Sequence, residues 1–129
     1  MSFLAKLMVD GQVFNILQCN YRFKQNIDAI GQPISITMGG QMNLTIESIR
    51  SNTFYDWIIS PTMMKSGAII FYRRDTMSKL KELTFNDTYC IEYNERYNHE
   101  GEYPMQIDIE LSAKELILEE STFKNNWPE

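Results

Sequence analysis

The stretch from Gly67 to Tyr93 constrains the fold more than any other part of the chain. Its first run, 67–72, is rich in β-branched and aromatic residues on both alternating faces, which is typical of a strand buried on two sides. A polar turn follows over 75–78, and the apolar residues of the next strand fall on odd positions: Leu83, Phe85, Tyr89, Ile91 and Tyr93. Asn86-Asp87 interrupts this alternation and predicts a bulge. The result is a long, bent hairpin of the kind that lets a sheet curl toward a barrel.

Period-two alternation predicts further strands on both sides of this hairpin. Asp10-Gly11 is a two-residue hairpin turn between the first two of them. The expected strands cover residues 3–9, 12–23, 41–47, 105–113 and 116–119. Residues 94–102 are polar and predict a loop, and the two aromatic residues of the tail, 121–129, are candidates for docking on the barrel.

A helical period appears once, between Ser51 and Ser60. Thr53 with Asp56 resembles a capping box, and Pro61 ends the element. Three apolar side chains lie at i, i+3 and i+4 and are expected to anchor the helix in the core rather than to contact a ligand: Phe54, Trp57 and Ile58.

The segment from Lys24 to Gly40 is the longest stretch of turn and loop residues in the chain, and loops of this length in compact domains usually have a function. It nevertheless carries five apolar side chains, Ile27, Ile30, Ile34, Ile36 and Met38. If they are exposed, a partner that covers them is the better explanation. Residues 34–38 could pair with a sheet edge on that partner. In the alternative, the segment folds back as an ordinary strand of the same barrel.

Composition bounds the class of protein. A chain of 129 residues, 43% hydrophobic and 22% charged, predicts one globular domain over 1–129. The net charge of −5 disfavours nucleic acid and anionic lipid as partners, since both select basic surfaces. No signal peptide or membrane-length apolar run is visible, so we expect synthesis in the cytoplasm and no membrane insertion. Cys19 and Cys90 are accordingly expected to be reduced, buried thiols.

The residues suggest no catalytic, cofactor-binding or metal site. Gly39-Gly40 leads into a strand rather than a helix, so it does not predict a phosphate-binding loop. His99 is the one histidine, lies in a polar loop, and together with two distant cysteines cannot supply a usual zinc ligand set. Glu119-Glu120 is a neighbouring carboxylate pair whose side chains would point to opposite faces of a strand. We therefore expect a protein that is not an enzyme and needs no cofactor.

The order of these segments resembles a known family. The Asp10-Gly11 hairpin precedes a long loop, and the helix ends Trp57-Ile58-Ile59-Ser60-Pro61. The sequence then runs through Phe71-Tyr72-Arg73-Arg74-Asp75 and Leu83-Thr84-Phe85-Asn86-Asp87-Thr88-Tyr89-Cys90, and closes with Ser121-Thr122-Phe123-Lys124-Asn125-Asn126-Trp127-Pro128. Over essentially its whole length the chain is similar to the haemolysin-coregulated proteins of type VI secretion systems, in the branch called TssD. Thr62-Met63-Met64 departs from the polar loop expected there.

This resemblance implies a mainly β fold, a small antiparallel β-barrel of two packed sheets with one short flanking α-helix and a long protruding loop. It implies a structural subunit, six copies of which form a ring that stacks into the secretion tube. The implied partners are the chain itself, a contractile sheath, a spike protein and effectors held in the lumen. The protein would leave the cell through the secretion machine, and the loop 25–40 would contact the next ring.

Two other hypotheses remain open at this point. A monomeric barrel could bind a small apolar ligand in its mouth. A small β hydrolase could use Asp108 and Glu110, which point the same way from one strand.

Overall fold

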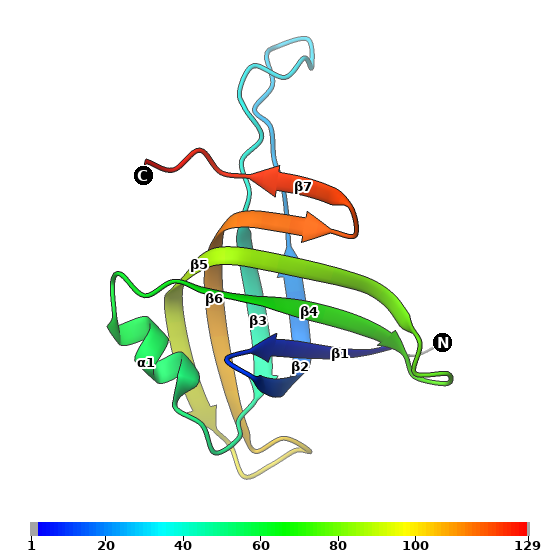
Figure 1. The fold of residues 1–129 in the computed structure, drawn as a ribbon, viewed down its shortest axis with the longest axis vertical. Helices are drawn as coiled ribbons and strands as arrows, with labels where there is room; N and C mark the ends of the chain where they lie inside the picture. The colour runs from blue at the N-terminus through cyan, green and yellow to red at the C-terminus, as the bar shows by residue number, and fades with distance from the viewer. Residues whose placement is uncertain (1–2, 129) are drawn as a thin grey trace.

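The computed structural model describes residues 3–128, whose strands close into a barrel (Figure 1). The elements are β1 (Phe3–Val9), β2 (Gln12–Tyr21), β3 (Gln41–Glu47), α1 (Thr53–Ile59), β4 (Lys65–Arg73), β5 (Lys79–Tyr97), β6 (Met105–Leu118) and β7 (Ser121–Lys124). The antiparallel sheet has the order β3-β2-β1-β4-β5-β6-β7, and β3 also pairs with β6. The expected β-barrel with one short helix is therefore confirmed. Its two expected sheets are joined by the β3–β6 ladder into one closed sheet, from which β7 extends.

The first hairpin has the predicted turn. Asp10 and Gly11 both have positive φ, 55° and 69°, as a type I′ turn requires. β1 then pairs with β2 on one side and with β4 on the other, so both of its edges are hydrogen-bonded within the barrel wall. β2 ends at Tyr21, two residues earlier than the alternation predicted.

The predicted bulge is present at Asp87, which has a φ of 51°. Between the pairs Lys65–Thr88 and Gly67–Phe85, β5 contains one residue more than β4. Beyond this point the apolar residues on odd positions do not all face the core, because the bulge reverses the phase. Thr88 and Cys90 are buried, whereas Ile91 is half exposed. Tyr93 packs against the core again after a second irregularity between Cys90 and Glu92.

Two strands are longer than the sequence indicated. β5 continues to Tyr97 through residues that were expected to form a loop, and it pairs there with the start of β6. β6 is one continuous strand where two were expected. Its first half pairs with β3 and its second half with β7, and its apolar pattern changes phase between residues 113 and 116. Glu119 and Glu120 form the turn before β7 rather than part of a strand.

The barrel interior is filled by apolar side chains from the wall and from α1. Phe14 of β2 lies edge-on to Phe54 of α1, with ring centroids 4.7 Å apart. In β4 the consecutive residues Ile69 and Ile70 are both buried, as expected for a strand covered on two sides. Residues 24–40, which protrude from the barrel, are the main part of the chain outside this core.

The helix begins one residue earlier than a capping box at Thr53 would allow. Its N-cap is Asn52, which makes no side-chain cap, and Thr53 is already helical. The hydroxyl of Ser51 accepts the Thr53 N–H at 3.2 Å instead. The expected Thr53–Asp56 box is therefore wrong, although the helix itself is where the period placed it.

Candidate assembly surface

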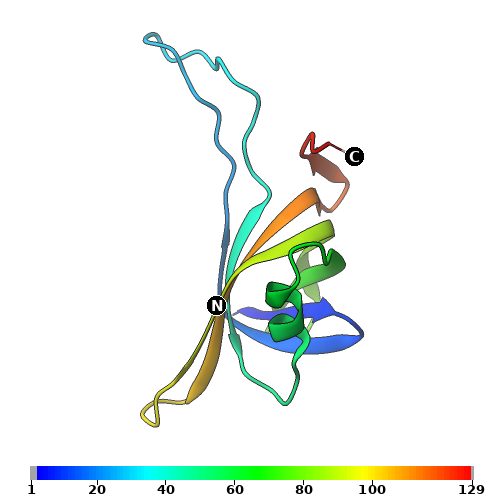
Figure 2. The same cartoon turned by 90° about the vertical axis from the view of Figure 1, so that its left-hand side faces the viewer.

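Residues 24–40 form an arm that projects away from the barrel along the long axis of the molecule (Figures 1 and 2). The arm is an irregular hairpin held by its own backbone. Lys24 and Met38 exchange two hydrogen bonds of 2.8 and 2.7 Å, and a second bridge joins Ile27 to Pro33. At the tip, the Asp28 carboxylate accepts the N–H groups of Ile30 and Gln32, each at 3.0 Å. The alternative in which this segment forms a strand of the barrel is thus wrong.

The five apolar side chains singled out in the arm all lie outside the core. Their exposed fractions are 60% for Ile27, 80% for Ile30, 66% for Ile34, 81% for Ile36 and 43% for Met38. A side chain that is four-fifths exposed gains almost none of the free energy that apolar burial provides. The arm therefore presents an apolar surface that other parts of this chain leave largely exposed to solvent.

The backbone of the arm is partly satisfied within the arm itself. Besides the Lys24–Met38 bridge, the N–H of Ile34 donates to the carbonyl of Asn26 at 2.8 Å. Side chains also cross it, since the Gln25 amide donates to the Thr37 hydroxyl at 2.9 Å. Residues 34–38 are thus engaged with the opposite strand of the arm, and pairing with another molecule is limited to their outer edge.

The structure places two of the three candidate helix anchors in the core. Trp57 and Phe54 are 0% and 2% exposed, whereas Ile58 is only partly buried against them. The indole N–H of Trp57 is shared between the carbonyl oxygens of Met63, at 3.1 Å, and Thr88, at 3.2 Å. Met63, in the segment that departs from the family's polar loop, thus packs on the core and helps to hold the indole, while its neighbour Met64 is about half exposed.

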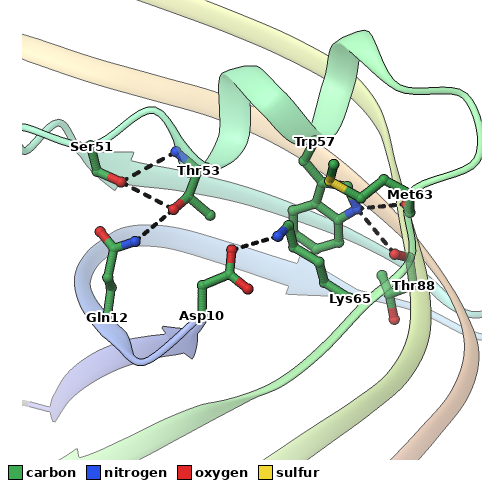
Figure 3. A network of polar contacts seen from close by, with 8 residues as sticks. All are labelled: Asp10, Gln12, Ser51, Thr53, Trp57, Met63, Lys65 and Thr88. Atoms are coloured by element: carbon green, nitrogen blue, oxygen red, sulfur yellow. Dashed lines mark hydrogen bonds and ion pairs between the residues drawn. The ribbon is translucent and has the colours of Figure 1, made fainter.

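Polar contacts fasten the start of the helix to the first hairpin (Figure 3). The Gln12 amide donates to the Thr53 hydroxyl at 2.6 Å. The Lys65 ammonium pairs with Asp10 at 2.5 Å, and the lysine side chain is largely buried. The first contact joins α1 to the hairpin, and the second joins the start of β4 to the same hairpin.

An apolar recess lies near the root of the arm, with a volume of about 220 Å³. Tyr21, Phe23 and Phe123 line part of it, together with leucines of β5 and β6. This volume is below the range usual for small-molecule sites, and the barrel interior is packed with side chains. A larger hollow of about 530 Å³ includes Lys6, Arg74 and Arg96 in its lining, which does not suit an apolar ligand. Neither hollow therefore supports a barrel that binds a small apolar ligand.

The carboxylates considered for hydrolysis lie on the outer face of β6. Asp108 accepts hydrogen bonds from the Thr45 hydroxyl at 2.6 Å and from the Arg96 guanidinium at 2.9 Å. The bond from Arg96 lowers the pKa of Asp108 below its usual value, against the effect of partial burial. A general acid needs a raised pKa, so this arrangement opposes acid catalysis by the pair Asp108 and Glu110.

Other reactive groups also lack the properties of a catalytic site. Burial raises the pKa of each cysteine thiol, Cys19 and Cys90, to about 11, which keeps both protonated and weakly nucleophilic. Among residues 3–128, acidic, cysteine and histidine side chains do not gather in threes as a metal ion would need. The one described helix is too short to cross a membrane.

Sequence reasoning missed the residues that hold the root of the arm. Asn125 reaches the carbonyl oxygens of Gly39 and Ala113 with its side-chain amide. Gly39 and Gly40 are buried there. The adjacent glycines were the available signal, because a buried Gly-Gly pair indicates that another group approaches the backbone closely.

The family model described as "Hemolysin coregulated protein Hcp (TssD)" matches residues 1–128. A solved structure, Hcp1 from Flavobacterium johnsoniae, is 31% identical and superposes with a TM-score of 0.90, covering 95% of this chain and 99% of the relative. No curated protein matches the chain by sequence.

More distant structures share the fold. Hcp1 from Salmonella typhimurium has a TM-score of 0.76 at 14% identity, with 95% of this chain and 92% of that chain covered. The sheath–tube complex of PVC, an extracellular contractile injection system in its extended state, contains a chain with a TM-score of 0.54 at 16% identity, with 92% and 88% covered. Because the family model spans nearly every residue and the Flavobacterium relative aligns over its full length, the chain belongs to the haemolysin-coregulated protein (TssD) family, the non-enzymatic tube subunits that type VI secretion systems assemble and secrete.

Proposed function

We propose that six copies of this chain close into a ring and that the arm, residues 24–40, links each ring to the next one in the tube. The observation that carries this proposal is the exposure of the five apolar arm side chains, up to 81% at Ile36. Lys24 and Asp28 are the charged residues in the arm, so its surface is close to neutral. Burying this surface against a second copy would remove apolar area from water without separating charges from their hydration.

The contacts within a ring are proposed to involve the wall around β1. Val13 of β2 is 53% exposed and Phe3 of β1 is 46% exposed, although both lie on strands of the barrel. An apolar surface of this kind on a closed barrel is best explained by a neighbouring subunit. Residues 13–17 and 68–72, which flank β1, are the stretches proposed for this contact.

The tube is proposed to act with a contractile sheath and a spike protein, and to carry effector proteins in the lumen of its rings. The support is membership of the family and the likeness to a chain of a sheath–tube complex. The barrel supplies a rigid wall, and the arm supplies the connection along the tube axis.

The first experiment tests ring formation with the unmodified protein. Multi-angle light scattering and negative-stain microscopy are expected to give six-membered rings with a central hole. Monomers alone, over a wide concentration range, would contradict the proposal.

The second experiment separates the arm from the fold. Residues 27–38 are replaced by a short glycine-serine bridge between Asn26 and Gly39. We expect this variant to stay folded and to form single rings, but to lose stacking and secretion. A double variant that keeps the arm apolar, Ile30→Leu with Ile36→Leu, is the matched control and is expected to stack. Unfolding of the shortened variant, or tubes of normal length, would contradict a stacking role for the arm.

A further inference from the structure

The segment that follows β7 lies across the root of the arm. The rings of Phe123 in β7 and of Phe23, the residue before the arm, are tilted against each other, with centroids 4.9 Å apart. The backbone N–H of Asn125 donates to the carbonyl of Lys114 at 2.7 Å, which continues the pairing of β6 with β7 beyond the end of β7. The C-terminal segment is therefore fixed to β6 at the point where the arm leaves the barrel (Figure 1).

The side chain of Asn125 extends the ladder that closes the barrel. The last paired residues of β3 and β6 at this end are Gln41 and Ser112, after which the N–H of Ala113 donates to the Gly40 carbonyl at 2.7 Å. The Asn125 amide then donates to the carbonyl oxygens of Gly39, at 3.0 Å, and Ala113, at 2.9 Å. A side chain thus connects the backbones of the arm and β6 where the strand pairing stops.

The two glycines give this contact its geometry. Gly40 has a φ of 96°, which side-chain-bearing residues rarely adopt. A Cβ added to Gly40 would lie 2.5 Å from the Asn125 amide nitrogen and 2.6 Å from the Ala113 carbonyl oxygen, and one added to Gly39 would overlap the Phe23 ring. Absence of a side chain at these positions is what allows Asn125 and Phe23 to reach the backbone.

We propose that Asn125, with Phe123 against Phe23, is a positioning site that fixes the direction in which the arm leaves the barrel. It rests on the proposed function of the arm in stacking. The hydrogen bonds within the arm join its two sides to each other, whereas the Asn125 bonds join the arm to the wall. The C-terminal segment accordingly sets whether the apolar arm is aimed at the next ring, and Asn125 is a specificity-determining residue for stacking.

The test compares Asn125→Asp with Asn126→Asp. Asn126 is the exposed neighbour, so the control introduces the same charge without touching the arm. In Asn125→Asp a carboxylate oxygen replaces the donating nitrogen and faces two carbonyl oxygens, and both hydrogen bonds are lost. We expect hydrogen exchange of the Lys24 and Met38 amides to speed up by roughly tenfold, as expected when about one net hydrogen bond is lost. The amide of Ile109, in the centre of β6, is expected to exchange at its normal rate, and rings are expected to form with short or no stacks.

Asn125→Ala removes the same donors without adding charge, and it serves as the second variant if the aspartate also weakens the barrel. Unchanged exchange in the arm of Asn125→Ala would overturn the proposal, as would an equal acceleration in Asn126→Asp. The exchange measurement needs no assembly. If the unmodified protein does not stack, the proposed function fails by itself; if it stacks and Asn125→Ala stacks equally well, the positioning site fails.

Discussion

The arm and the helix α1 are both insertions between strands that are consecutive in the sequence, and both carry large apolar side chains, but they end up in opposite environments. The arm connects β2 to β3, and its Ile36 is 81% exposed; the helix connects β3 to β4, and its Trp57 is 0% exposed. Apolar content therefore does not decide which insertion joins the core. What differs is whether the polar groups of the segment form hydrogen bonds with the barrel or with the segment itself.

The polar contacts of the two regions show this difference. Trp57 donates to backbone carbonyls of the β4 connection and of β5, and the start of the helix is bonded to the first hairpin. The arm bonds mainly to itself from Lys24 to Met38, and its tip is closed by Asp28. The helix thus stabilises the subunit, while the arm remains available to a second copy.

The largest expected effect is that of Trp57→Ala. Removing a fully buried indole leaves a cavity and removes the N–H that two carbonyl oxygens share, so the free energy of unfolding should fall by about 3–5 kcal/mol. Urea unfolding followed by circular dichroism measures it. Trp57→Phe keeps an aromatic ring and should cost less. If Trp57→Ala left the urea unfolding curve unchanged, the comparison would fail, because α1 would then be as dispensable to the fold as the arm.

Gly67→Ala should have the next largest effect. Gly67 lies in β4 opposite Val9, and an added Cβ would overlap the Met8 carbonyl oxygen and come within 2.8 Å of the Phe85 ring. Separating the strands by even a small amount should cost about 1–3 kcal/mol. A neutral Gly67→Ala would show that the β1–β4 wall is looser than the packing indicates.

A smaller effect is expected at the outer face of the wall. The folded state lowers the pKa of Asp108, first through its bond from Arg96, so this carboxylate contributes stability above its unfolded pKa of about 3.9 and loses it as the pH falls through the folded pKa. Asp108→Asn should therefore reduce stability at pH 7 by less than about 1 kcal/mol, because the pair is about one-third to one-half exposed, and by less still at pH 3. Urea unfolding at both pH values measures the difference. Glu110→Gln, on the same strand and face, is the control, and a larger deficit at pH 3 than at pH 7 would contradict the assignment.

Much of the scaffold could be predicted because alternation and turn chemistry act locally. The Asp10-Gly11 turn, the bulge at Asp87 and the helical stripe are all encoded within a few neighbouring residues. The phase beyond the bulge could not be predicted from the positions of the apolar residues. Tyr89 is one of these residues, but its ring packs against Trp127 in the C-terminal segment, with 5.5 Å between the ring centroids. The end of β5 was missed because polar residues 94–97 leave no periodic signal.

The arm shows the same limit more clearly. Its apolar residues and its length predicted a partner, but the contact of Asn125 with Gly39 joins positions far apart in the sequence. Such a contact depends on the barrel having already closed through β3 and β6. Sequence patterns therefore located the candidate surface but not the residues that orient it.

The smallest expected effect on the subunit is that of Ile30→Ser with Ile36→Ser in the arm. Both side chains are at least 80% exposed, so each substitution should change the free energy of unfolding by no more than about 0.5 kcal/mol. Assembly should respond very differently, because two of the most exposed apolar side chains are removed from the proposed contact between rings. Unfolding is measured on dilute subunits, and tube length by negative-stain microscopy at high concentration, with Ile30→Leu and Ile36→Leu as the apolar control. A loss of stability comparable to that of Gly67→Ala would place the arm with the core, and normal tubes would remove the arm from the ring contact. Normal subunit stability with short tubes is the combination that separates the arm from the helix, since only the helix finds its apolar partners within its own chain.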